Sequence, residues 1–148
     1  MKKNYLKFLG MIITSAIFMY GVMYLNTYAW DHIFFSEMRV YMTILSTCVM
    51  AIVMLMFMLH MLKDKKINAA ILVVSVLTFG VTFFMMRNQT TIDQVDYMEG
   101  MIPHHSIAIL TSERAEIEDP RVRKLADEII KAQEKEIAEM KKLIEDLD

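Results

Sequence analysis

The sequence predicts an all-α protein in which three transmembrane helices precede a helical hairpin, and three observations support this prediction. Hydrophobic residues make up 55% of the 148 positions, with 16 methionines but only four glycines and two prolines. Three uncharged stretches are each about as long as a helix that crosses a bilayer. After position 90 the pattern becomes amphipathic, with apolar residues at helical spacing.

Composition and charge exclude several other classes of protein. The large apolar fraction excludes a disordered chain, and a single cysteine, Cys48, excludes a disulfide scaffold. Residues 1–90 carry eight basic and three acidic side chains, whereas residues 91–148 carry eight and fifteen, so their net charges are +5 and −7. No dense basic patch is present, which argues against nucleic acid as a partner. We therefore expect two domains, a transmembrane domain at 1–90 and a second domain at 91–148.

The uncharged stretches lie at about residues 8–25, 40–62 and 67–86. A helix satisfies its own backbone hydrogen bonds, so each stretch is predicted to cross the lipid bilayer. Lysines precede the first stretch and separate the second from the third, and positive charge marks the cytoplasmic side. The sequence therefore predicts a multi-pass protein of the cytoplasmic (inner) membrane with its N-terminus inside and its C-terminal domain periplasmic or extracellular. The alternative for the first stretch is a signal peptide cleaved near Ala29.

Two further patterns accompany the predicted spans. Aromatic residues after the first span are expected to form a belt at the outer interface: Tyr24, Tyr28 and Trp30. Methionines recur at helical spacing in the second span: Met50, Met54, Met58 and Met61. Methionine is an adaptable packing residue, and a thioether ladder can also bind a soft cation such as Cu(I). The sequence leaves both interpretations of this stripe open.

The acidic domain is predicted to be an antiparallel pair of helices. Thr91 or Asp93 can cap the first helix, which is expected to run to about Ile117. Pro120 suits the first position of the second helix, which is expected to run to about Leu147. Two such helices bury little surface, so we expect a homodimer or higher oligomer that completes a four-helix bundle.

Candidate metal ligands cluster on the first of these helices. Met98, Met101 and His105 share one face, whereas His104 points toward the edge of the core. If the hairpin folds at Asp119, two residues of the second helix lie opposite this face, with Gln133 facing His105 and Met140 facing Met98.

The chemistry of these side chains favours copper. Thioethers select Cu(I), and imidazole binds copper or zinc. Neither a thiolate nor paired carboxylates accompany the cluster, which favours copper over zinc. A diiron site is not expected, because its Glu and Glu-x-x-His pattern is absent.

The run from Tyr97 to His105, with Ala108 and Ile109 after it, resembles the signature of the domain-of-unknown-function 305 family. The likeness continues through positions of the second helix: Leu125, Ala126, Gln133, Glu136, Ile137 and Met140. This family is similar to ferritin-like helical proteins and includes periplasmic copper-resistance proteins of the CopM kind. The resemblance implies half of a ferritin-like four-helix bundle. It also implies copper binding outside the cytoplasm through Met98, Met101, His104, His105 and Met140.

The sequence therefore predicts a membrane-anchored protein that binds a copper ion, as Cu(I), for buffering, resistance or delivery to a copper-handling protein partner. An enzyme is not expected, although His104 or His105 could transfer protons near neutral pH, because no nucleophile accompanies them in the pattern. The alternative function is a structural or sensory membrane protein whose hairpin recruits a protein partner.

Overall fold

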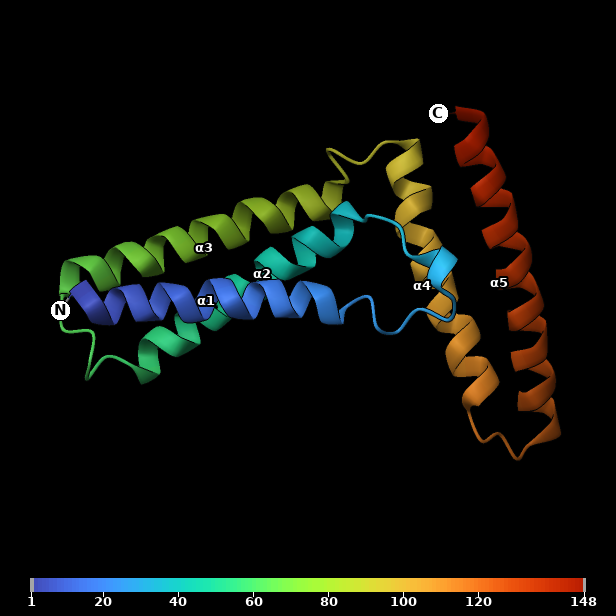
Figure 1. Ribbon diagram of the computed structural model, residues 1–148, viewed down its shortest axis with the longest axis horizontal. Helices are drawn as coiled ribbons and strands as arrows, with labels where there is room; N and C mark the ends of the chain where they lie inside the picture. Colours follow the sequence, from blue (N-terminus) through green and yellow to red (C-terminus); the bar gives the residue numbers. More distant parts are fainter. Residues whose placement is uncertain (1, 148) are drawn as a thin grey trace. The chain divides into compact units, whose positions relative to one another are not determined.

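The computed structural model describes residues 2–147, and within that range the chain is helical without any strand. The elements follow one another in the order α1 (Lys2–Val22), η1 (Trp30–His32), α2 (Glu37–Phe57), α3 (Lys65–Asn88), α4 (Gln94–Arg114) and α5 (Pro120–Leu147) (Figure 1). The predicted all-α class is confirmed. Two compact units form. The membrane unit consists of the chain before Met23 together with Met38–Thr91, and the hairpin unit consists of Met23–Glu37 together with the chain from Ile92 onward.

The helices of the membrane unit confirm the prediction of three segments suited to span a membrane. α1, α2 and α3 are each long and apolar enough to cross a bilayer. Many of their large apolar side chains are exposed, as with Phe18 on α1 and Leu77 on α3, which are 70% and 62% exposed. A continuous apolar surface of this kind is stable in lipid rather than in water.

The second span ends at Phe57, earlier than the expected Leu62. The following residues form a turn in which the N–H groups of Met61 and Leu62 both donate to the Met58 carbonyl at 2.9 Å. Asp64 then caps α3, because its Oδ1 accepts the N–H of Lys66 at 3.0 Å. The hydroxyl of Tyr5, on α1, accepts the Asp64 N–H at 3.0 Å and so holds this turn in place.

The methionine stripe begins on α2 and continues into the turn after it, next to the apolar core of the membrane unit. That core is a buried cluster of Phe8, Ile12, Ala51, Leu55 and Leu62. Met50, Met54 and Met58 are partly buried against it, whereas Met61 is 40% exposed. This packing against a hydrocarbon cluster is consistent with the role of methionine as a flexible packing residue.

α4 and α5 of the hairpin unit lie side by side and run antiparallel (Figure 1). They enclose a buried cluster of Met98, Ile102, Ile109, Ile137 and Ile144. α4 starts where Asp93 caps it, since Asp93 Oδ1 accepts the N–H groups of Val95 and Asp96 at 2.8 and 2.9 Å. α4 ends at Arg114 rather than near Ile117.

The connection between α1 and α2, residues Met23–Glu37, packs with the hairpin, and we call it the strap. Its Tyr28 N–H donates to Ser106 Oγ at 2.7 Å. The strap lies within the predicted 1–90 domain by sequence, yet it joins the hairpin unit in space. Trp30 at the start of η1 is 89% exposed.

Candidate metal centre

A groove of about 670 Å³ lies between α4 and α5, and four of the five predicted ligands line it. We call it the soft groove. Its lining residues are Gln94, Tyr97, Met98, Met101, His105, Glu136, Glu139, Met140, Leu143 and Leu147. The fifth predicted ligand, His104, is exposed and does not line the groove. The structure therefore brings together Met98, Met101, His105 and Met140.

The regular geometry of α4 aligns its three ligands. Asp93 and Asp96 form a capping box, in which each side chain accepts a backbone N–H of the other residue. This cap fixes where the helix begins. Positions 98, 101 and 105 then fall on one side of α4, because residues three, four and seven apart share a helix face.

The His105 ring is held by two hydrogen-bond contacts. Its Nδ1 lies 2.9 Å from the Met101 carbonyl oxygen, and its Nε2 lies 2.7 Å from Glu136 Oε2. A carbonyl oxygen only accepts, so Nδ1 carries the proton in that bond. Backbone carbonyls orient metal-binding imidazoles in this way, and an ion would have to replace the Glu136 contact at Nε2. The His105 side chain is only 12% exposed, so the ring is shielded at the groove wall.

The residue that meets His105 is Glu136, whereas the sequence placed Gln133 opposite it. Side chains on a helix lean toward its N-terminus. In an antiparallel pair, His105 therefore leans away from the connecting turn while Glu136 leans back toward it, so the contact moves about one turn along α5. Counting positions from Asp119 ignores this lean. The carboxylate of Glu136 is 52% exposed and stands at the rim of the groove.

Thioethers define the donor chemistry of the soft groove. Within residues 2–147, no three or more His, Cys, Asp or Glu side chains are placed to hold a metal ion. The groove instead gathers three thioethers, from Met98, Met101 and Met140, with one imidazole and two carboxylates. A set dominated by sulfur and nitrogen fits a soft ion better than magnesium, calcium or a diiron centre.

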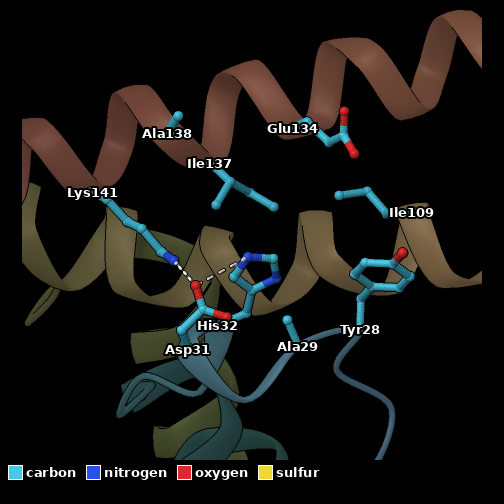
Figure 2. Close-up of a pocket in the computed structure, with 9 residues that line it drawn as sticks. All are labelled: Tyr28, Ala29, Asp31, His32, Ile109, Glu134, Ile137, Ala138 and Lys141. Carbon is cyan, nitrogen blue, oxygen red and sulfur yellow. Dashed lines mark hydrogen bonds and ion pairs between the residues drawn. The ribbon is translucent and has the colours of Figure 1, made fainter.

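On another side of the hairpin, the strap meets α4 and α5 around a cavity of about 380 Å³ (Figure 2). Lys141 Nζ donates to Asp31 Oδ2 at 2.6 Å, as Figure 2 shows. His32 Nδ1 lies 3.0 Å from Ser106 Oγ. Sequence analysis did not identify these contacts, because only the folded strap brings residues near position 30 to those near 106 and 141.

Charges at this seam shift the pKa values of three strap residues. The hydrogen bond and charge of Lys141 lower the pKa of Asp31, although partial burial opposes the shift. Burial and then the Lys141 charge lower the pKa of His32, while Asp31 opposes them. A hydrogen bond with Glu113, together with the charge of that carboxylate, raises the pKa of Tyr28.

Comparisons with known proteins give one family match, over the hairpin, and one relative. A family model described as "Domain of unknown function (DUF305)" matches residues 88–148. An uncharacterized protein of Acanthamoeba polyphaga mimivirus is 36% identical over 77 residues. That alignment covers 51% of this chain and 51% of the viral protein, so the chain spans about half the length of this relative. No solved structure matches the chain at a significant level.

Proposed function

Residues 88–148 belong to the DUF305 family, and from this premise we propose that the chain is a membrane-anchored protein that binds copper as Cu(I). The observation that carries the proposal is the soft groove, where three thioethers accompany an imidazole whose Nδ1 is tied to the Met101 carbonyl. Soft ligands select Cu(I) over the harder cations of the cell. The role would be buffering, resistance or delivery to a copper-handling partner.

Each ligand has a distinct part in this proposal. Met98, Met101 and Met140 would hold the ion through sulfur, and His105 would hold it through Nε2. Glu136 would keep the His105 ring oriented until the ion takes the place of the proton between them. His104 is proposed as an accessory ligand, because its exposed ring lies beside that of His105 with the ring centroids 6.1 Å apart.

The charge of the chain supports capture of a cation. The segment from residue 91 onward carries a net charge of −7, and Glu136 and Glu139 both line the soft groove. A surface of this sign raises the local concentration of cations, more strongly at low ionic strength. The residues lining the groove include no serine, threonine or cysteine, so we propose a binding protein rather than an enzyme.

We propose that the hairpin lies outside the cytoplasm, since the lysines flank the other ends of the spans. The chain allows a direct test because its single cysteine, Cys48, is buried within α2. A cysteine introduced by Lys142→Cys should react with an impermeant maleimide added to intact cells. Protection of that thiol until the cells are lysed would reverse the proposed orientation.

A second copy of the chain is proposed as a partner of the hairpin. α5 leaves a set of large apolar side chains exposed: Val122, Leu125, Leu143 and Leu147. Two helices make a small scaffold, and pairing with a second hairpin would cover part of this surface. Size measurement in detergent should give a dimer or higher oligomer, and a monomer would count against the pairing.

The proposed copper site is tested by titrating the purified full chain in detergent with Cu(I) under anaerobic conditions, using a chromogenic chelator as competitor. One Cu(I) per hairpin is expected. His105→Ala should weaken binding at least a hundredfold, as loss of a direct ligand exceeds the tenfold to hundredfold cost of losing a ligand's supporting partner. His60→Ala, an exposed histidine of the membrane unit, is the matched control and should bind normally. Equal binding by both variants would reject the site.

A further inference from the structure

Among the contacts between the strap and the hairpin, three involve hairpin residues that are next in sequence to a proposed ligand. Ser36 approaches Gly100, where an added Cβ would stand 3.4 Å from the serine Oγ. Tyr28 and His32 both reach Ser106, and Asp31 reaches Lys141. Gly100 precedes Met101, Ser106 follows His105, and Lys141 follows Met140.

This adjacency places the strap on the same helical turns as the ligands but on a different side. Successive residues of a helix point about 100° apart. The side chains of Met101, His105 and Met140 therefore enter the soft groove, while their neighbours face the strap. Contacts on the strap side fix the rotation of α4 and α5 about their axes, and that rotation decides where the thioethers and the imidazole point.

Polar contacts hold the strap against the hairpin, and we call the contacts of Ser106 and Lys141 with the strap the latch. Ser106 is fully buried and its Oγ meets two strap groups, the N–H of Tyr28 at 2.7 Å and Nδ1 of His32 at 3.0 Å. The Lys141–Asp31 pair lies at the cavity that Tyr28 and His32 also line (Figure 2). These polar groups bond to one another, so the cavity is better suited to holding the strap than to taking up a separate ligand.

We propose that the strap is a positioning element for the soft groove, so that docking of the strap and binding of Cu(I) strengthen each other. The inference rests on the proposed function, because it names the regulation of the same site. Coupling between two such events is reciprocal, so whatever the strap adds to metal affinity, the metal adds to strap docking.

Affinity measurements on latch variants test the first half of this coupling. Asp31→Asn, Ser106→Ala and Lys141→Met should each weaken Cu(I) binding by about tenfold, a typical coupling between sites. Lys142→Met is the matched control, since Lys142 is the exposed neighbour of Lys141, and it should bind as the parent chain does.

The sign of the Lys141→Met effect separates positioning from simple electrostatics. Removing a positive charge beside a cation site should strengthen Cu(I) binding if charge alone acted, whereas removing the charge of Asp31 should weaken it. The positioning role predicts weaker binding in both variants. The double variant Asp31→Asn with Lys141→Met should be no weaker than either single variant, because both remove the same contact.

Hydrogen exchange of the full chain in detergent tests the reciprocal half. Cu(I) should slow exchange of the strap amides, including the Tyr28 N–H that bonds to Ser106. His105→Ala should abolish this protection because it removes the ion. The Ser106→Ala variant should also lose this protection, yet it should still bind Cu(I). A variant whose hairpin had unfolded would not bind the ion.

The outcomes distinguish the inference from the function on which it rests. Weaker binding in the three latch variants together with metal-dependent protection of the strap supports the coupling. Normal Cu(I) affinity in those variants, with strap exchange unaffected by the ion, overturns the coupling and leaves the copper site intact. Absence of Cu(I) binding by the parent chain overturns the proposed function and the coupling together.

Discussion

The two units of the chain use methionine in different surroundings. In the membrane unit, Met50, Met54 and Met58 pack against hydrocarbon side chains such as Phe8 and Leu55. In the hairpin unit, methionines line an open groove with an imidazole and two carboxylates: Met98, Met101 and Met140. A flexible, polarizable side chain suits both settings, as packing in the first and as the sulfur ligand of the proposed copper site in the second.

The difference shows which feature of a methionine-rich sequence points to a metal. Both units have methionines at helical spacing, so spacing alone does not separate packing from binding. The hairpin adds a histidine whose ring is oriented by a backbone carbonyl, whereas the membrane stripe packs against a cluster of apolar residues. Thioethers beside an oriented imidazole are therefore the pattern that predicts a copper site.

Exchanging methionines for leucine in one unit at a time should give the largest contrast. The triple change Met98→Leu, Met101→Leu and Met140→Leu keeps side-chain volume nearly constant but removes all three thioethers. We expect Cu(I) affinity to fall by at least a hundredfold. The same change at Met50, Met54 and Met58 should leave affinity within about twofold. Competition with a Cu(I) chelator measures both, and equal losses would show that the membrane stripe also binds the ion.

Truncating one apolar residue in each unit compares a side chain buried in protein with one that is expected to face lipid. Ile102 on α4 has no exposed surface, so Ile102→Ala should cost about 2–5 kcal/mol of unfolding free energy. Leu77 on α3 is 62% exposed, and in lipid Leu77→Ala should cost about 0.5 kcal/mol or less. Unfolding by denaturant in detergent, followed by circular dichroism, measures both. Similar costs would mean that α3 is buried in an assembly.

Removing one carboxylate at a time examines the rim of the soft groove. Glu136→Gln replaces the carboxylate that contacts His105 Nε2 and should weaken Cu(I) binding about tenfold. This is the lower end of the tenfold to hundredfold range that is typical when the group supporting a metal ligand is lost. Glu139→Gln changes the same charge in the same groove without touching His105, so it is the control for electrostatics. If both variants lose affinity equally, Glu136 acts only through its charge.

The smallest expected effect concerns the strap, and it depends on pH. Burial and Lys141 lower the pKa of His32 below its usual value of 6.5 in the folded chain. Folding therefore favours the neutral His32 ring. Its contribution to the free energy of unfolding is fully present above pH 6.5 and is lost as the pH falls through the folded-state pKa. Between pH 7.5 and 5.0, the melting temperature should fall further in the parent chain than in His32→Gln. Parallel falls would contradict this assignment.

The sequence predicted the helices better than it predicted their contacts. Long uncharged stretches and a capping residue such as Asp93 act locally, so the spans and the start of α4 could be placed from the pattern. The ends of α2 and α4 were placed too late, because turns after Phe57 and Arg114 depend on bonds to distant groups such as Tyr5 and Arg123.

The candidate site was partly predictable for a similar reason. Met98, Met101 and His105 were placed together because they belong to one helix, and Met140 followed from the antiparallel pairing. Glu136 was missed because the lean of side chains moves the contact along α5. The strap contacts with Ser106 and Lys141 were missed because hydropathy gives no indication that a loop between two spans returns to a distant helix.

Trp30 gives the strap an optical property that no other part of the chain shares. It is the single tryptophan of the sequence, and it stands 89% exposed in η1, next to the Asp31 that pairs with Lys141. The long-wavelength emission of the unmodified protein therefore comes from this one indole. Its emission maximum and its quenching by a water-soluble agent therefore report on the strap in real time, in micelles or in native vesicles, without any attached dye.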